Sequence, residues 1–387
     1  MKEGWEYKKL GDVANFISGY TPNKEEISNQ GKYPYFKVAE MNIAGNELFM
    51  RNTSLFVNSP KRIYPKGSII FPKNGGAIYT EKKRILEVDS VIDLNTEAIF
   101  PTAQVELMYL FFLLTFTKIS SFDKGGGLPS LDIKKMSESI IPVPPLSEQQ
   151  SIVDYLDSAF AKIDAMKANA EKALNEAKAL FQASLKEMLE PKEGWEEKKL
   201  GEVGTFIRGG NFSKKDFVEG GFPCIHYGQI HTKLGVATYK HLSCVPASMV
   251  KKDRCASRGD LVIAVTSEDD EGSCKCTAWM ADYDAYVGGH TAILKHSLNP
   301  IFVSYYFKAA RFQKAKLEYT HGFKVVEISP KDIAKIPIAY PSPSEQQSIV
   351  ATLDSLKSKV DRLQENCDKI SQECDALKQA ILRQVFE

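Results

Sequence analysis

The chain has 387 residues, of which 43% are hydrophobic, 26% are charged and 10% are aromatic. This is an ordinary globular composition, which excludes intrinsic disorder, collagen and low-complexity scaffolds, and the length predicts two domains or slightly more. The 50 basic and 49 acidic side chains leave a net charge of +1, so a uniformly basic nucleic-acid binder is excluded, whereas a protein with segregated charge is not. The most apolar run, near residues 107–116, is far shorter than the roughly 20 residues that a membrane-spanning helix needs. Since the start of the chain has no apolar leader either, we expect a cytoplasmic protein.

The chain is an internal duplication. Residues 2–24 and 192–214 are identical at 14 of 23 positions, and residues 141–164 and 338–361 at 14 of 24. Between these blocks the two halves share only two short stretches of similarity, one between residues 66–70 and 258–262 and the other between residues 33–35 and 222–224. Because drift alone would not spare the ends, we expect a shared frame around two different recognition surfaces. An old duplication with freely drifting middles is the alternative.

Both halves begin with Gly-Trp-Glu, which places Trp5 and Trp195 at matching positions. A tryptophan buries a large area, and a matched pair indicates a matched structural role. We therefore predict that each tryptophan anchors its half to the end of a long helix.

Two long helices are predicted to begin at the Ser-Glu-Gln-Gln segments that follow Pro144 and Pro145 in the first half and Pro341 and Pro343 in the second. Ser147-x-x-Gln150 and Ser344-x-x-Gln347 match the capping box, in which serine and glutamine satisfy backbone amides at a helix start. Each helix extends over about 43 residues, or roughly 65 Å at 1.5 Å per residue. Alternating steps of four and three then predict a left-handed coiled coil. The first stripe is rich in alanine and the second in Leu, Ile and Val, so antiparallel pairing would place small side chains against large ones. Two separate helices that dock on outside partners are the alternative. The predicted core positions are Ile152, Leu156, Ala159, Ile163, Met166, Ala170, Ala173, Ala177, Leu180 and Ser184 in the first helix, and Ile349, Leu353, Leu356, Val360, Leu363, Cys367, Ile370, Cys374, Leu377 and Ile381 in the second.

The sequence lacks the motifs of enzymes that act on DNA. Neither a glycine-rich methyltransferase cofactor loop nor a Walker A motif is present, and Asn299-Pro300 is better explained as a helix start with proline in the first turn. The seven cysteines and six histidines all lie beyond residue 223. An odd cysteine count argues against a disulfide framework, and the absence of paired Cys-x-x-Cys knuckles disfavours a zinc site. The residues considered for such a site are Cys244, Cys255, Cys274, Cys276 and His226, and the acidic run 268–271 is interpreted as a solvated loop tip.

Charge separates along the chain. Residues 1–146 and 192–343 have net charges of +2 and +4, whereas the helical segments 147–191 and 344–387 have −3 and −2. This distribution favours globular parts that touch phosphate on an acidic spacer that does not, with ordinary solvated surfaces as the alternative.

The repeated G-W-E-x-x-x-L-G starts and P-x-x-S-E-Q-Q helix starts resemble those of the specificity subunit of a type I restriction–modification system. The resemblance covers the whole chain and implies an α+β fold with a pseudo-twofold internal duplication. Two mixed α/β target-recognition domains, 1–146 and 192–343, are then joined by two long antiparallel coiled-coil helices, 147–191 and 344–387.

The resemblance implies a non-catalytic subunit that binds double-stranded DNA and reads the two halves of a split, asymmetric target. It also implies that the helices bind two adenine-methyltransferase subunits, and that motor/nuclease subunits join through the complex. The chain itself is expected to hold no cofactor, with S-adenosylmethionine, Mg and ATP on the partner subunits.

DNA contacts are expected from polar or basic loop residues near glycine, because Arg, Lys, Asn and Gln read base edges and Lys serves phosphate. In the first domain the candidates are Tyr20, Asn23, Lys24, Lys73, Asn74, Lys82, Lys83, Arg84 and Lys124. In the second they are Arg208, Asn211, Lys214, Lys215, His226, Tyr227, Gln229, Lys251, Lys252, Ser267, Lys275 and Lys324. For any one of them, ordinary surface exposure is the alternative.

Two other functions remain open at this point. A stand-alone bivalent DNA-binding regulator would explain two heads and a rod, but not the near-identical helix starts. A scaffold that binds two different proteins would be excluded by sequence-specific DNA binding.

Overall fold

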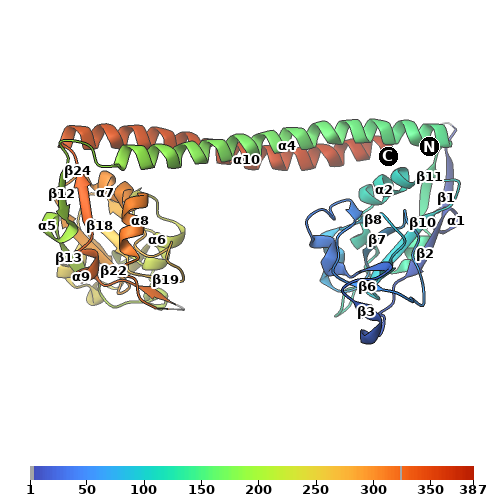
Figure 1. Ribbon diagram of the computed structural model, residues 1–387, viewed down its shortest axis with the longest axis horizontal. Helices are drawn as coiled ribbons and strands as arrows, with labels where there is room; N and C mark the ends of the chain where they lie inside the picture. Colours follow the sequence, from blue (N-terminus) through green and yellow to red (C-terminus); the bar gives the residue numbers. More distant parts are fainter. Residues whose placement is uncertain (1–3, 323–324) are drawn as a thin grey trace. The chain divides into compact units, whose positions relative to one another are not determined.

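A computed structural model describes residues 4–322 and 325–387, which form two compact units. The first unit consists of the residues up to Ala170 together with Asp368–Glu387, and the second consists of Glu171–Cys367. Both are mixed α/β domains, so the α+β prediction is confirmed (Figure 1). Within the described residues, no helix has both the length and the apolar character needed to cross a membrane.

The first unit contains a two-stranded ribbon and two sheets. In the ribbon, β1 (Glu6–Lys9) pairs antiparallel with β11 (Ile140–Val143), and α1 (Leu10–Val13) follows β1. The larger sheet has the order β2 (Ala14–Ser18), β10 (Thr96–Pro101), β7 (Ile69–Pro72), β8 (Arg84–Leu86) and β5 (Phe49–Met50). The smaller sheet has the order β3 (Ile27–Ser28), β6 (Phe56–Val57), β4 (Tyr33–Phe36) and β9 (Val91–Ile92). Helices α2 (Leu107–Phe116) and α3 (Ile133–Ser137) complete the unit.

The second unit repeats this plan with different side chains. Its ribbon pairs β12 (Glu196–Lys199) with β24 (Pro337–Tyr340), and α5 (Leu200–Val203) follows β12. The larger sheet has the order β13 (Gly204–Arg208), β22 (Thr291–His296), β18 (Leu261–Ala264), β20 (Cys276–Trp279) and β15 (Ala237–Thr238). The smaller sheet has the order β16 (Ser243–Val245), β14 (Phe222–Ile225), β21 (Ala285–Val287) and β17 (Cys255–Ala256). The remaining elements are α6 (Tyr227–Thr232), α7 (Pro300–Tyr306), α8 (Ala310–Lys316), α9 (Pro330–Ile333), β19 (Thr266–Ser267) and β23 (Val326–Glu327).

The central strand of each larger sheet is buried on both faces, which explains its uninterrupted apolar sequence. In β7, Ile69 and Phe71 belong to the core that includes α2, whereas Ile70 belongs to the core on the opposite face. In β18, Leu261 and Ile263 likewise pack with α7, while Val262 faces the other way. The short stretch of similarity between 66–70 and 258–262 therefore marks the same strand in the two units. The predicted helix start at Asn299 is confirmed, since its side chain accepts the backbone N–H groups of Ile301 and Phe302.

Two 44-residue helices, α4 (Leu146–Leu189) and α10 (Pro343–Phe386), contribute to both units and pack together (Figure 1). In the first unit, Lys378 Nζ lies 2.5 Å from Asp164 Oδ1, and Lys167 Nζ lies 3.9 Å from Asp375 Oδ1. The residue numbers run in opposite directions along the two helices, so this pairing is antiparallel, as predicted.

Three of the ten predicted core positions of α4, Met166, Ala173 and Leu180, are exposed. Met166 and Leu180 are 57% and 60% exposed, whereas Leu174 and Phe181 are only 6% and 8% exposed. The apolar residues of α4 allow two stripes of equal spacing, and packing against the second unit's core selects the one that contains Phe181. In α10 the predicted stripe is buried or half-buried except at Leu377, which is 47% exposed.

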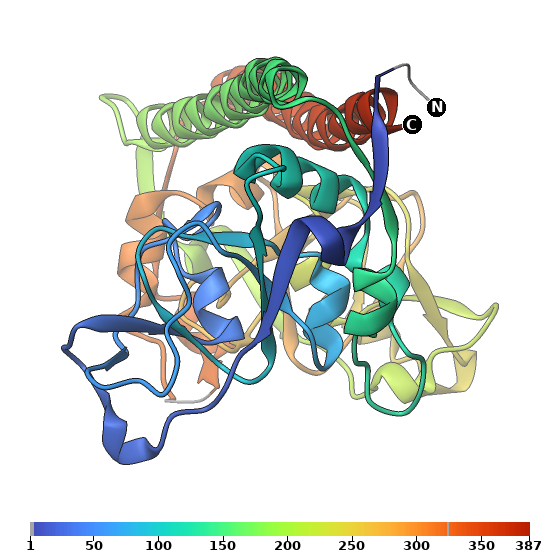
Figure 2. The same cartoon turned by 90° about the vertical axis from the view of Figure 1, so that its right-hand side faces the viewer.

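Each unit's core incorporates residues from both long helices. In the first unit, α2 lies between the larger sheet and the helix pair (Figure 2), and the Phe386 ring of α10 packs against Tyr109 and Phe116 at centroid distances of 5.5 and 5.7 Å. In the second unit, Phe181 of α4 and Leu353 of α10 join the core around α7. The helices are thus structural parts of the domains.

The helix starts differ from the predicted capping boxes. The helices begin at Leu146 and Pro343, so Ser147 and Ser344 already lie inside them. The side chain that ties down the start of α4 belongs to Gln149, the residue before the predicted Gln150. The Gln149 side chain, fully buried, donates to the carbonyls of Pro144 (2.8 Å) and Gln104 (3.0 Å) and accepts from the Glu106 N–H (2.8 Å).

The second unit has the same arrangement. Gln346 donates to the Pro341 carbonyl at 2.9 Å and accepts from the Asn299 N–H at 2.9 Å. Both glutamines therefore tie the start of a long helix to the start of α2 or α7. By contrast, the Gln150 side chain bonds only to Asp154, one turn along the same helix.

The predicted tryptophan anchors are confirmed. The indole N–H of Trp5 donates to the Glu148 carboxylate at 2.8 Å, and that of Trp195 donates to Glu345 at 3.3 Å. Each half thus begins with a Trp–Glu contact to the first turn of the long helix that follows it.

Candidate functional site

Each unit has a groove beside the end of the central strand of its larger sheet. The first groove has a volume of about 460 Å³ and is lined by Lys37, Val38, Ala39, Asn74, Gly75, Gly76, Ala77, Asp93, Asn95 and Leu128. The second groove has a volume of about 510 Å³ and is lined by Lys214, Tyr227, Gly228, His231, Thr232, Thr266, Ser267, Glu268, Asp269, Gly272, Lys275 and Val325.

The two grooves occupy the same place in the duplicated fold. Strand register aligns Pro72 with Ala264, since these residues pair with Thr96 and Thr291 at the same end of β10 and β22. Asn74 thereby corresponds to Thr266. Asn74 pairs with Ser130 and Thr266 pairs with Glu327. In the segments that contain these partners, two hydrogen bonds recur at the same spacing, from the Lys124 N–H to the Ser130 carbonyl and from the His321 N–H to the Glu327 carbonyl. Leu128 then corresponds to Val325.

A matching turn forms the third side of both grooves. The Lys37 N–H donates to the Glu40 carboxylate at 2.9 Å, and the His226 N–H donates to the Gln229 side-chain oxygen at 2.9 Å. Val38 and Tyr227, the residues that follow, line the two grooves. The same backbone therefore presents an aliphatic side chain in one groove and an aromatic side chain in the other.

Polar side chains in the first groove hold one another in place. The Ser130 hydroxyl donates to Asn74 Oδ1 at 3.1 Å, and Asn74 Nδ2 donates to Asn95 Oδ1 at 3.3 Å. Gly75, with φ 74°, follows Asn74, and nothing lies within 4 Å of where its Cβ would be. The groove floor is therefore open beside an asparagine whose position is fixed.

Aromatic and imidazole rings surround Tyr227 in the second groove. Its ring centroid lies 4.5 Å from His226, 5.1 Å from His290 and 6.1 Å from His231. His226 is buried, and its Nδ1 accepts the Gly228 N–H at 3.1 Å. Burial, with the positive charge of Lys214 and the neighbouring His290, lowers the pKa of His226 below its usual 6.5. The neutral ring is therefore favoured, as this hydrogen bond requires.

The second groove carries charge of both signs. Lys214 and Lys275 line it together with Glu268 and Asp269. A surface that only follows phosphates is uniformly basic, whereas base edges offer donors and acceptors and can be read by both signs. The second groove therefore offers both cationic donors and anionic acceptors. The acidic run 268–271 thus borders the groove, although its charges alone had indicated only a solvated loop tip.

The predicted site residues of the first domain are scattered. Asn74 lines the groove, and Lys124 is exposed next to its glycine-rich wall. Lys73 forms an ion pair with Glu97 at 3.1 Å, Lys82 bonds to Asn42, and Arg84 donates to the carbonyls of Lys83 and Met41. Lys83 is buried beside Glu81, which removes it from any exposed surface. Tyr20 is half-buried with its hydroxyl enclosed, and Asn23 and Lys24 are exposed in a 3-10 turn.

In the second domain, four predicted residues meet in the groove: Lys214, Tyr227, Ser267 and Lys275. His226 lies buried behind Tyr227, and Gln229 spans the His226 N–H and the Ser243 hydroxyl. Arg208 is exposed and lies 3.6 Å from Glu327. Asn211, Lys215, Lys251 and Lys252 are exposed outside the groove lining, and Lys324 lies outside the described residues.

Sequence reasoning missed the apolar and backbone parts of the grooves. Leu128 and Val325 are 76% and 53% exposed and line equivalent walls, yet a search for polar residues passes over them. Lys37 and His231 were also missed. The three glycines before Leu128 could have indicated its exposure, because they place this apolar side chain on a loop and not in a helix or strand that packs on a core.

The cysteines form no reactive or metal-binding group. All seven are free, and the described residues include no cluster of three or more His, Cys, Asp or Glu side chains suited to a metal. Burial raises the pKa of the Cys274 thiol to about 12 and that of Cys276 to about 11. They pack as small apolar side chains.

Comparison with known proteins agrees with this architecture. The model of the family described as type I restriction modification DNA specificity domain matches the chain twice, at residues 2–176 and 192–372. The specificity subunit of the type I restriction enzyme MjaVIII from Methanocaldococcus jannaschii is 26% identical, over 92% of this chain and 87% of that protein. The EcoKI specificity subunit of Escherichia coli K12 is 27% identical over 48% of this chain and 42% of that protein.

Solved structures share the fold. A chain from work on the assembly and conformational transition of the type I restriction–modification system has a TM-score of 0.78 at 20% identity, covering 100% of this chain and 98% of that one. The HsdS subunit from Thermoanaerobacter tengcongensis has a TM-score of 0.61 at 22% identity, covering 100% and 97%. The two family matches cover most of the chain, so it belongs to the type I restriction–modification specificity subunits, the non-catalytic subunits that recognise the DNA target.

Proposed function

We propose that the first and second grooves read the two different halves of a split DNA target. The observation that carries this proposal is that one backbone framework presents different side chains at equivalent positions. Asn74 corresponds to Thr266, Val38 to Tyr227 and Leu128 to Val325. A shared frame with different groove linings is what recognition of two unlike half-sites requires, since base identity is read by side chains at fixed positions.

Lysines at or beside the grooves serve the phosphate backbone in this proposal. Lys124 in the first unit and Lys214 and Lys275 in the second are exposed. Lysine is a flexible point charge that suits phosphate, and contacts of this kind position a protein on DNA without specifying sequence. The bases are then read by the asparagine, the hydroxyl groups and the aromatic side chain of the groove linings.

The partners in this proposal are two copies of one adenine-methyltransferase subunit, with motor/nuclease subunits joining through the complex. Support comes from the duplication, because a chain that presents the same helix start and Trp–Glu contact twice offers two equivalent docking surfaces. Exposed apolar residues on the long helices add to such surfaces. They are Tyr155, Met166 and Leu377 in the first unit and Leu180 in the second.

The chain works in the cytoplasm in this proposal and holds no cofactor of its own. S-adenosylmethionine, Mg and ATP belong to the partner subunits. Specificity subunits form a family that is generally free of cofactors, which supports this division of tasks.

The decisive experiment replaces residues 25–140 with the corresponding segment of another family member and sequences the methylated sites in cells. We expect one half of the target to change and the other half and the spacer to remain. A change in both halves would contradict independent reading by the two grooves. Copurification with the native partners should yield two methyltransferase subunits per chain, and a chain that binds its target without them would instead be a stand-alone regulator.

A further inference from the structure

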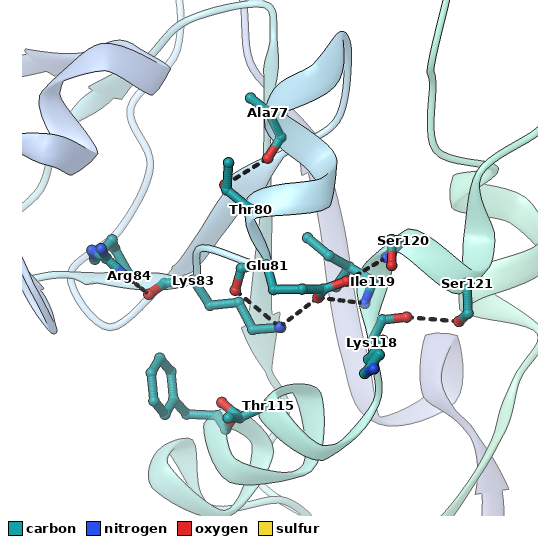
Figure 3. Close-up of polar contacts among 11 residues, drawn as sticks. Ala77, Thr80, Glu81, Lys83, Arg84, Thr115, Lys118, Ile119, Ser120 and Ser121 are labelled. Atoms are coloured by element: carbon teal, nitrogen blue, oxygen red, sulfur yellow. Dashed lines mark hydrogen bonds and ion pairs between the residues drawn. The ribbon is translucent and has the colours of Figure 1, made fainter. Parts of the chain in front are cut away.

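A half-buried carboxylate lies behind the first groove. Glu81 directly follows the 3-10 helix η3 (Gly76–Thr80) and has a left-handed backbone with φ 54°. Its side chain accepts the backbone N–H groups of Ile119 at 2.9 Å and Ser120 at 3.0 Å (Figure 3). One residue thus connects η3 to the 3-10 helix η4 (Ile119–Phe122), which lies almost forty positions later in the chain.

The partner of this carboxylate is a buried lysine. Lys83 Nζ lies 3.2 Å from Glu81 Oε2 and 3.3 Å from the Glu81 carbonyl oxygen, and its side chain is only 4% exposed (Figure 3). Hydrogen bonds from Ser120 and Lys83 outweigh the desolvation that comes with burial and lower the pKa of Glu81, so its charged form is favoured. Removing the Glu81 carboxylate would leave the buried Lys83 ammonium without its charged partner, which is energetically costly.

The two segments that Glu81 joins continue into neighbouring parts of the lining of the first groove, where Asn74 and Ser130 form an antiparallel bridge and the Gly75 N–H donates to the Pro129 carbonyl at 2.8 Å. Residues 74–75 precede η3, and residues 124–130 follow η4. Further hydrogen bonds link the segments, since the Tyr79 hydroxyl donates to Asp123 Oδ2 at 2.5 Å and Asp123 Oδ1 accepts the Ser130 N–H at 3.1 Å. Ser130 in turn donates to Asn74 at 3.1 Å. The contacts from Glu81 therefore lead by short steps to a side chain in the groove.

The second unit builds the equivalent corner without a carboxylate. The register of β8 and β20 aligns Arg84 with Thr277, and hence Glu81 with Cys274. Glu81 and Cys274 are the only non-glycine residues with positive φ in the described part of the chain, at 54° and 62°. Here the buried ammonium comes from Lys316 of α8, which donates to the Ser273 carbonyl at 2.7 Å. The backbone of the corner is thus retained while the groups that fix it differ.

We propose that Glu81 is a positioning residue for base recognition by the first unit, holding the paired segments 74–75 and 124–130 of the first groove in the position that its half-site requires. This inference rests on the proposed function of the groove. A left-handed residue with a side chain persists only where its surroundings fix it, and such residues are concentrated at functional sites. Glu81 touches no DNA itself and acts through Asn74 and the 124–130 segment.

The test uses the full chain in complex with its methyltransferase partners. The probes are DNA duplexes with the target found by sequencing methylated sites, and copies with one base pair changed in either half. In E81G the backbone conformation is unstrained and the carboxylate is gone. We expect discrimination against changes in the first half-site to fall at least tenfold, with discrimination in the second half-site kept within twofold. The second unit, which has Cys274 at this position, is the control within the same chain.

Two further variants make the outcomes distinguishable. E81Q/K83M removes both charges of the pair and is expected to show the same selective loss, so it replaces E81G if that variant is too unstable to purify. N74A tests the groove itself. If N74A weakens first-half discrimination and neither Glu81 variant does, the positioning role is wrong and the groove proposal stands. If none of the three does, the groove proposal fails. A lower melting temperature in the Glu81 variants with discrimination intact in both halves would mean that the pair only stabilises the fold.

Discussion

The side-chain oxygen of Gln149 accepts the backbone N–H of Glu106 at 2.8 Å, which fixes the first turn of α4 to the first turn of α2. Because Gln149 is fully buried and also donates to two carbonyls, its replacement leaves several polar groups without partners. We expect Gln149→Leu to lower the free energy of unfolding by about 1–3 kcal/mol, the typical penalty for an unsatisfied buried polar group. Gln150→Leu, at the exposed neighbouring position, should change it by no more than about 0.5 kcal/mol. Urea unfolding measures both, and equal effects would refute the assignment.

Adjacent residues of α4 test the packing of the coiled coil. Phe181 is 8% exposed and Leu180 is 60% exposed. Phe181→Ala should destabilise the chain by about 3–5 kcal/mol, as for other buried phenylalanines. Leu180→Ala should have an effect within about 0.5 kcal/mol. If denaturant unfolding showed Leu180→Ala to be the more destabilising of the two substitutions, the core stripe predicted from the sequence would be correct.

The exposed apolar residues of the long helices test the proposed docking of partners. Met166→Asp places a charge on a side chain that is 57% exposed, so the isolated subunit should remain folded by circular dichroism. Its affinity for the methyltransferase subunit should fall, since a desolvated charge at an apolar contact is costly. Lys172→Asp, at an exposed polar position of the same helix, is the control. Normal assembly of M166D would place the docking surface elsewhere.

The aromatic side chain of the second groove should contribute to specificity. Tyr227→Ala is expected to reduce discrimination in the second half-site by about 1–3 kcal/mol per base contacted. Lys214→Ala should weaken binding to all sequences alike and reduce its salt dependence, as expected for a phosphate contact. Tyr239→Ala alters an exposed tyrosine outside the groove lining of the same unit and serves as the control. Competition binding with single-pair variants of the target separates these outcomes.

The turn that carries Tyr227 should weaken in acid. The pKa of His226 in the folded chain lies below its usual 6.5, because burial and nearby positive charge disfavour the proton. As the pH falls below 6.5, the unfolded chain therefore binds a proton that the folded chain resists, and stability decreases. Protonation also makes Nδ1 a donor, which breaks the bond from the Gly228 N–H.

In His226→Asn, the side chain still caps α6 but does not titrate. The variant should lose less stability than the unsubstituted chain between pH 6.5 and 5. His296, whose pKa is also lowered by burial, is unchanged in both and cancels from the comparison. If the variant and the unsubstituted chain lost the same free energy of unfolding between pH 6.5 and 5, His226 would not titrate in this range.

The fold could be predicted from the sequence where a local signal and the packing agree. The duplication, the two long helices and the turn at Asn299 follow from repeated residues, periodicity and capping chemistry. The register of α4 did not follow, because Met166 and Leu174 are equally apolar and only contact with the rest of the fold decides which is buried. The same applies to Gln149 and Gln150, which are identical in chemistry and differ only in the direction in which the helix presents them.

The site was harder to predict because exposure depends on the whole fold. Tyr227, Ser267 and Asn74 line the grooves as expected for polar residues near glycine. Lys83 has the same local features, yet the chain places it beside Glu81 and away from solvent. Leu128 was passed over because an apolar side chain is ordinarily assigned to a core, whereas here it is 76% exposed at a groove wall.

The two ribbons have a consequence at the level of the gene. In the first unit Glu6 lies opposite Val143, and in the second Glu196 lies opposite Tyr340, so the chain enters and leaves each recognition domain on neighbouring strands. The stretches of coding sequence that specify these strands are the ones that the two halves share. A crossover within them exchanges everything in between as a cassette and leaves the Trp–Glu contact and the buried glutamine intact. Such an exchange can supply a new target only if the incoming α2 or α7 still fits the two long helices, because both helices belong to the core of each domain.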